Sequence, residues 1–121
     1  MRVKEIRDEV SRLFPALQVF AYNMPVDIKR GVLVVANMPA DIHQDIYGYR
    51  IGEFTIVVRD SDYESGIDIA TQISSALTGE GLTISGVYFM FIRAKHEPMV
   101  FPRSEGNGLE FSVSFQCRFV T

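Results

Sequence analysis

Few side chains in this sequence combine the type and the spacing that catalysis requires. The two histidines, His43 and His96, lie far apart, and neither accompanies a Ser or Cys in a nucleophile motif such as G-x-S-x-G. The single cysteine, Cys117, alternates with aromatic residues, which predicts a buried thiol that behaves as a small hydrophobic group. Glycine pairs at 79–81 and 106–108 lack the third glycine and the following helix of a phosphate-binding loop. These observations predict no catalytic residue, no bound cofactor and no enzyme activity.

The residues best spaced for a metal ion are Asp41, His43 and Asp45. In an extended segment, residues two apart share one face, so the three side chains would offer oxygen and nitrogen ligands to a divalent cation. A mobile acidic loop with a solvated histidine explains the same residues. We favour the loop and expect no metal, because three ligands on flexible backbone would leave half of the coordination sphere to water.

Tyr47, Tyr49 and Arg50 form an aromatic and basic group around Gly48. The two rings suit stacking on a base. Together with His43, these residues would be the catalytic or binding residues of a small enzyme or ligand-binding domain. Aromatic side chains on a loop are also typical anchors of protein interfaces. We favour the interface interpretation, because no acid–base pair or nucleophile pair is visible beside them.

Charges are separated along the chain. Residues 60–80 contain five acidic side chains and no Lys or Arg, whereas basic side chains predominate in residues 93–103. Two ordinary solvated surfaces would account for this separation. Alternatively, the acidic helix of one subunit meets the basic loop of the next, since unlike and complementary patches on one chain generate rings. The interface candidates are Asp60, Asp62, Glu64, Asp68, Arg93, Lys95, Arg103, Tyr47, Tyr49 and Arg50.

The elements that position these residues follow from apolar periodicity. Apolar residues at helical spacing predict a helix from Val3 to Phe14, stopped by Pro15, and a second helix that starts at Asp60–Glu64 and ends before Gly79. Strands are expected at about 17–22, 32–36, 51–59, 83–93 and 109–119, with loops at 37–50 and 94–108. The order α-β-β-β-α-β-β predicts an α+β fold: a mostly antiparallel sheet of about five strands with two helices packed on one face.

Length and composition exclude several classes of protein. The 121 residues, 47% hydrophobic and 12% aromatic, predict one globular domain over residues 1–121 and exclude a disordered chain. No apolar run approaches the roughly 20 residues of a membrane-spanning helix, and the N-terminus is not that of a signal peptide. The net charge of −3 disfavours a dedicated nucleic-acid binder, which needs a basic excess. A reducing, cytoplasmic setting suits the single cysteine.

The run EFTIVVRDSDYESGIDIATQISSALTGEG resembles the central segment of phage tail terminator proteins, also described as minor capsid or tail completion proteins. In that family a strand ending in a basic residue leads through a D-Y-E start into a helix that closes in A-L-x-G. Here these positions are 54–59, 62–64 and 76–79. The ending EPMVFPRSEGNGLEFSVSFQCRFV is similar to the family's proline and arginine–acid turn before a long final strand. The resemblance covers nearly the whole chain.

The resemblance implies a structural protein of the virion tail or neck, assembled in the host cytoplasm. Such proteins form a ring, usually a hexamer, that caps the tail tube, ends its polymerisation and joins the tail to the head. The implied partners are further copies of the chain, the tail tube protein, head-completion or connector proteins, and DNA that passes through the ring without sequence-specific binding; no membrane is implied. We expect the polar face of a long strand, or the loop at 37–50, to face the lumen or the next ring. The alternative is another neck component, such as a head-closure protein.

Overall fold

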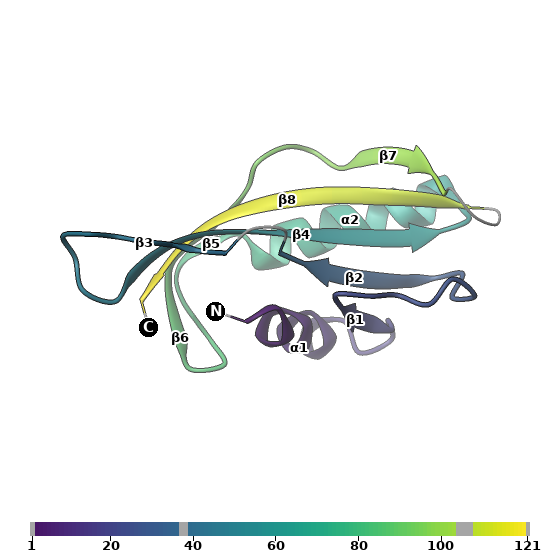
Figure 1. Ribbon diagram of the computed structural model, residues 1–121. Helices are drawn as coiled ribbons and strands as arrows, with labels where there is room; N and C mark the ends of the chain where they lie inside the picture. Colours follow the sequence, from purple (N-terminus) through teal and green to yellow (C-terminus); the bar gives the residue numbers. More distant parts are fainter. Residues whose placement is uncertain (1, 37–38, 104–107, 121) are drawn as a thin grey trace.

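Two long antiparallel strands form the centre of the fold (Figure 1). β4 (Tyr49–Asp60) and β8 (Leu109–Val120) pair along their full length, and the rings of Phe54 and Phe115 stack with centroids 5.0 Å apart. Alternate residues of β8 are buried, and most of those between them are only partly buried. The period of two in the sequence therefore corresponds to a strand with one face in the core, as predicted.

The computed structural model describes residues 2–36, 39–103 and 108–120. Besides β4 and β8, these residues form α1 (Val3–Leu13), β1 (Val19–Ala21), β2 (Gly31–Val35), β3 (Asp41–Ile42), α2 (Tyr63–Leu77), β5 (Gly79–Ile84), β6 (Val87–Ala94) and β7 (Met99–Pro102). This is the predicted α+β class. Among the described residues, no helix is both long enough and apolar enough to cross a lipid bilayer.

The strands form one curled sheet in the order β1-β2-β4-β8-β6-β5. β1 runs parallel to β2, and the other pairings in the described part of the chain are antiparallel. β3 pairs with the start of β4, and β7 pairs with the start of β8, beyond the end of β6. α1 contacts β1 and β2 at one edge of the sheet and β5 at the other. The sheet therefore curls until both of its edges reach the same helix.

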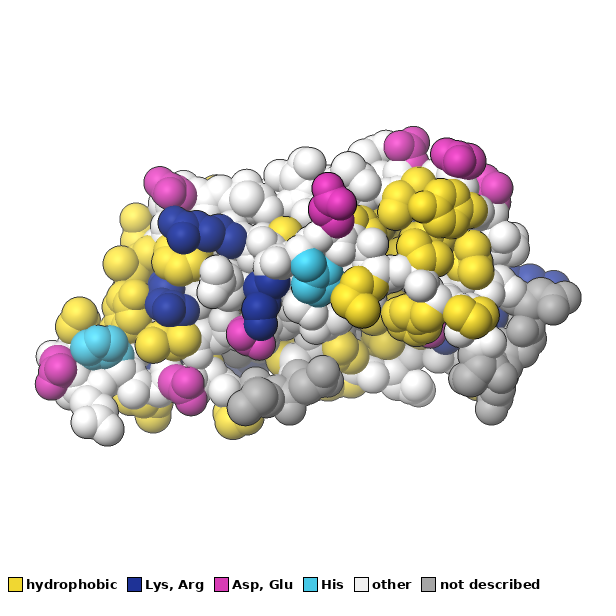
Figure 2. Space-filling view, turned by 90° about the horizontal axis from the view of Figure 1, so that it is seen from above, with side chains coloured by type: hydrophobic (Ala, Val, Ile, Leu, Met, Phe, Trp, Pro, Cys, Tyr) yellow, Lys and Arg dark blue, Asp and Glu magenta, His cyan; other side chains and the backbone are white. Residues whose placement is uncertain are grey.

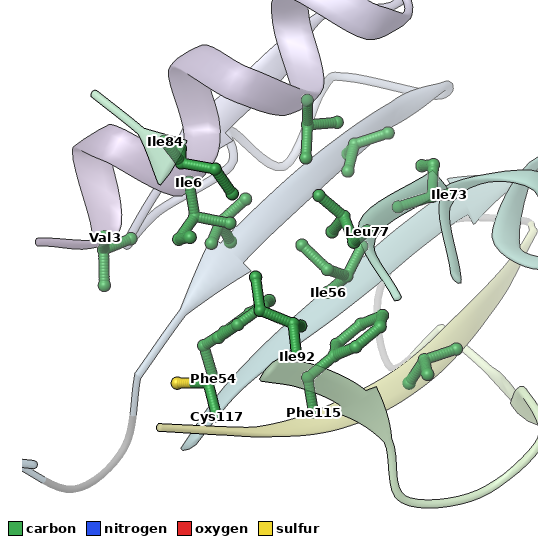
Figure 3. Close-up of a cluster of buried hydrophobic side chains, with 14 of the residues drawn as sticks. Val3, Ile6, Phe54, Ile56, Ile73, Leu77, Ile84, Ile92, Phe115 and Cys117 are labelled. Atoms are coloured by element: carbon green, nitrogen blue, oxygen red, sulfur yellow. The ribbon is translucent and has the colours of Figure 1, made fainter. Parts of the chain in front are cut away.

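Both helices contribute to one buried cluster, as expected for helices on one face of the sheet. Figure 3 shows side chains of α1, α2 and the sheet that point toward one another in this cluster. The fully buried members with the largest side chains are Phe54, Phe89, Phe111, Phe115, Phe119, Ile6, Ile56, Ile73, Leu77 and Ile92. The aromatic residues lie on the central and neighbouring strands, so the apolar face of the sheet supplies most of the bulk of the core.

The single strand predicted at 83–93 is wrong, because β5 and β6 form a hairpin over this region. Ser85 and Gly86 have φ angles of 50° and 81°. Two successive residues with positive φ make the tight turn that matches the twist of antiparallel strands. Gly79, expected to end the second helix, belongs to β5, and Thr78 is the C-cap of α2. With β3 and β7, the hairpin gives the described part of the chain a sheet of eight strands rather than about five.

Two further strands lie in segments predicted as loops. β3 falls within the predicted loop at 37–50 and β7 within the predicted loop at 94–108. Strands of two and four residues are too short to show a period of two, so the sequence pattern does not reveal them. The parts of these predicted loops at residues 37–38 and 104–107 lie outside the described residues.

Candidate interaction surfaces

The N-terminus of α2 carries the acidic residues that sequence analysis singled out. Asp62 is the N-cap, and its carboxylate accepts a hydrogen bond from the Ser65 amide at 3.0 Å. Asp60 is only 5% exposed: its carboxylate accepts hydrogen bonds from the Ser65 hydroxyl at 2.7 Å and the Asp62 amide at 3.0 Å. Arg30 lies 3.4 Å from the same carboxylate. Asp60 thus secures the start of the helix, and the acidic side chains exposed to solvent are Asp62, Glu64 and Asp68.

Exposed apolar side chains lie beside these carboxylates. All four residues of β7 are exposed, and Val100, at 38%, pairs with Phe111 and so lies on the face of the sheet that α2 covers. Met99 and Phe101 pair with Ser112 and Glu110 and lie on the open face. Tyr63, in the first turn of α2, is 49% exposed and rests against the buried ring of Phe111 at 5.9 Å. In Figure 2 a group of apolar side chains borders a group of acidic ones at one end of the molecule. We call this surface the acidic patch; its residues are Asp62, Tyr63, Glu64, Asp68 and Val100.

A groove of about 720 Å³ continues the acidic patch between α2 and the segment that joins β6 to β7. α2 lines it with Tyr63, Ile67 and hydroxyl-bearing residues one and two turns further on. The opposite wall is formed by residues 94–98. Here the edge of β8 is covered by His96, whose Nε2 accepts a hydrogen bond from the Ser114 amide at 3.3 Å. The groove therefore exists because β6 and β7 are separated along the same edge of β8.

A second surface lies on the open face of the sheet, where two arginines flank one aromatic ring. The guanidinium carbon of Arg93 lies 4.1 Å from the centroid of Phe91, and that of Arg118 lies 5.5 Å away. Arg93 also lies 3.7 Å from Glu80, and both side chains are more than half exposed. No carboxylate of the described residues lies within ion-pair distance of Arg118. We call this surface the arginine patch; its residues are Tyr88, Phe91, Arg93, Arg118 and Val120.

Lys95 and Arg103, predicted as part of one basic surface with Arg93, have other contacts. The Lys95 ammonium lies 3.0 Å from the carboxylate of Glu53 on β4. Arg103 donates hydrogen bonds to the carbonyl oxygens of Val26 at 2.6 Å and Ile28 at 3.4 Å. Arg103 thus holds the loop before β2, whereas Arg118, which sequence analysis did not single out, joins Arg93. The long-range register of β6 against β8 brings the two together.

Tyr47, Tyr49 and Arg50 occupy the end of the β3–β4 hairpin. Tyr47 is fully exposed, whereas the Tyr49 ring packs edge-on against His43 at 5.1 Å. The Nδ1 atom of His43 accepts hydrogen bonds from the amides of residues 45 and 46, each at 3.1 Å. A hollow of about 420 Å³ lies beside these residues. Among the described residues, no group of three His, Cys, Asp or Glu side chains is placed to hold a metal ion. His43 instead stabilises the turn.

Cys117 lies within the core. Its side chain is fully buried on β8, beside Gly52 of β4. Burial raises the pKa of the Cys117 thiol to about 11, because the charged thiolate is poorly solvated there. The neutral thiol is an inert packing group, as its alternation with aromatic residues predicts.

Comparisons with known proteins find a matching family model and a solved chain with the same fold. A family model described as "Bacteriophage tail terminator protein" matches residues 5–121. A solved chain from "Virion of native gene transfer agent (GTA) particle" has the same fold, with a TM-score of 0.66 and 15% identity over 93% of this chain and 84% of that chain. A second solved chain is 18% identical over 97% of this chain and 87% of its own, at a TM-score of 0.49. A search of curated protein sequences gave no match.

Proposed function

We propose, since this chain belongs to the bacteriophage tail terminator family, that it forms the ring that ends the tail tube. Family membership makes it a structural protein of the virion tail. The proposal goes further: copies of the chain sit side by side on the head-proximal end of the tube and stop the addition of tube subunits. The observation that carries the proposal is the family match, which extends over residues 5–121.

The architecture suits a ring subunit. β4 and β8 are twelve-residue strands, and both helices pack against the sheet in one core. The subunit is therefore rigid enough to keep its conformation in contact with neighbouring subunits. Its two charged and apolar surfaces differ from each other, and unlike surfaces on one chain make head-to-tail contacts that close into rings. We propose a hexamer, whose further partners are the tail tube protein on one side and head-completion proteins on the other.

DNA would pass through the centre of this ring without being held. The net charge of the chain is −3. Binding of DNA strengthens with each phosphate that a basic side chain neutralises, so an acidic to neutral lumen lets the duplex slide. The exposed tip of the β3–β4 hairpin, with Tyr47, is a candidate contact to the tube or to the next ring.

Deletion of the gene tests this function. Without a terminator, tube polymerisation has no stop, so electron micrographs should show tails of widely varying length that are not joined to heads. Supplying the intact gene in trans should restore one tail length. Normal-length tails joined to heads in the deletion mutant would refute the proposal. Tails of normal length that merely fail to join heads would place the protein elsewhere in the neck, for example in head closure.

A further inference from the structure

The two patches match each other in chemistry. The acidic patch combines exposed apolar side chains with three exposed carboxylates, and the arginine patch combines exposed aromatic and aliphatic groups with two guanidinium groups. We infer that the arginine patch of one copy binds the acidic patch of a second copy, and that this is the contact that repeats around the ring. The inference rests on the proposed function for its repetition in a ring, but the contact itself is testable separately.

The acidic patch has the composition of a protein-binding surface. Val100 is exposed on β7 and pairs with Phe111, against which Tyr63 packs. Tyr63 adds an aromatic face, and the adjoining groove offers a concave site of about 720 Å³. Exposed apolar side chains rimmed by charge are typical of interaction sites. The charged side chains of α2 beside these residues are acidic, which selects a basic partner, and Lys95 across the groove is already paired with Glu53.

The arginine patch is such a basic surface, and the guanidinium of Arg93 is already held in place there. Arg93 lies over the ring of Phe91, which restricts its guanidinium and leaves less conformational entropy to lose on binding. Its present carboxylate partner, Glu80, is 3.7 Å away and 78% exposed, and such exposed pairs contribute little. Both arginines can therefore turn their hydrogen-bond donors to carboxylates of another copy. A planar guanidinium suits carboxylates in a pair of parallel hydrogen bonds.

The patches lie far apart on the molecule. β8 connects them: Phe111, beneath Tyr63, is near its start, and Arg118 is near its end. In Figure 2 the larger groups of exposed basic side chains lie in the left half of the view, with acidic side chains near them, and the acidic and apolar group lies at the upper right. A copy bound through its arginine patch thus keeps its own acidic patch free for the next copy. Contacts of this head-to-tail kind continue until the rotation closes a ring.

Charge reversal on each patch tests the contact. One variant carries Glu64→Lys with Asp68→Lys, and the other carries Arg93→Glu with Arg118→Glu; Asp62 is left in place because it caps α2. Glu64, Asp68 and Arg93 are exposed and Arg118 is partly exposed. The two carboxylates have no ion pair within the described chain. The matched control, Lys4→Glu with Lys29→Glu, makes the same change in net charge as the arginine reversal but lies outside both patches.

Self-association is measured by sedimentation from micromolar to millimolar concentration, with circular dichroism to verify folding. We expect each reversal to weaken association by at least about tenfold, since like charges then face each other. The control should associate like the wild type. The variant with all four reversals should regain association, because the charges then attract again with the signs exchanged. Mixing the two reversed variants should also restore association, because in an alternating array each variant meets an oppositely charged patch on both of its sides.

Three results would overturn the inference: reversals that leave association unchanged, a fourfold variant that does not recover, or a wild-type chain that shows no association at millimolar concentration. These results would leave the tail-length experiment intact, so the contact and the function fail independently. Association that stops at two copies, with the same pattern of loss and recovery, would support the contact and contradict its repetition around a ring.

Discussion

Arg59 and Asp60 are adjacent charged residues at the end of β4, and both are held inside the molecule. Arg59 is 9% exposed; it lies 3.1 Å from the Glu110 carboxylate and donates hydrogen bonds to the carbonyl oxygens of Pro25 and Ile28. The sequence pattern predicts Asp60 as an interface residue at the surface and indicates no structural role for Arg59. Charged residues beside a turn are usually exposed. The partners of Arg59 are distant in sequence, so the residues around it give no sign that its side chain is buried.

Replacing Arg59 with lysine should therefore destabilise the fold even though the charge is kept. An ammonium group lacks the planar fork that reaches Glu110 and two carbonyls at once. We expect the free energy of unfolding to fall by about 1–3 kcal/mol, measured by urea denaturation. Arg12→Lys is the matched control, because the Arg12 side chain is 68% exposed and pairs with Glu9 on the surface. Equal effects of the two substitutions would contradict the structural role of Arg59.

The thiol of Cys117 predicts a dependence of stability on alkaline pH. Desolvation raises its pKa from an ordinary 9.0 to about 11 in the folded protein. The folded chain therefore holds this proton more tightly than the unfolded chain. The contribution is present in full below pH 9 and is lost as the pH rises from about 9 to 11.

Urea denaturation between pH 8 and 11 checks this sign. The free energy of unfolding of the wild type should fall more steeply above pH 9 than that of Cys117→Ala, whose other titrating groups are unchanged. In native protein at pH 8 the thiol should also react slowly with a thiol reagent, and rapidly in urea. Rapid reaction of the native protein would show that the thiol is accessible, contrary to its burial.

At the scale of elements, α2 approaches β8 closely at one glycine. A Cβ atom on Gly66 would overlap the ring of Phe111, which is buried in the core. Ala normally favours a helix by about 1 kcal/mol over Gly. Here we expect the opposite sign for Gly66→Ala, a net loss of about 1–3 kcal/mol, because a ring enclosed by the core has no room to move.

Thermal and urea unfolding of Gly66→Ala measure this effect, with Gln72→Ala as the control at an exposed position of the same helix. The control should be neutral or slightly stabilising. A more stable Gly66→Ala variant would mean that Phe111 yields easily, and that α2 is not seated on β8 as tightly as the structure shows.

The sequence pattern predicts strands where β1, β2 and β4 lie, and it predicts most closely the elements with many repeats of one period. α1, α2 and β8 contain enough turns or alternations for the order of apolar residues alone to identify the buried face. The β5–β6 hairpin was missed because its turn consists of only Ser85 and Gly86 between apolar residues. β3 and β7 exist only because a long strand beside them offers unpaired backbone groups, which is a property of the sheet and not of their own residues.

On the whole-molecule scale, sequence analysis separated acidic from basic residues but could not say which remain free. Folding places Glu80 beside Arg93 and directs Arg103 inward. It also adds Arg118 through strand register and Val100 through the short strand β7. Most acidic residues of the predicted contact are exposed in the structure. The basic surface consists of Arg93 and Arg118, whereas Lys95 and Arg103 have contacts elsewhere. Surface composition depends on contacts between distant segments, so charge order along the chain gives only the outline of an interface.

The most direct test of the tail terminator role is a cryo-electron microscopy map of intact particles at side-chain resolution. We predict that this fold occupies a closed ring at the head-proximal end of the tail tube, with Arg93 and Arg118 of each copy facing Glu64 and Asp68 of its neighbour. A map in which the chain is found away from the end of the tube, or in which its copies do not touch one another, would contradict the account.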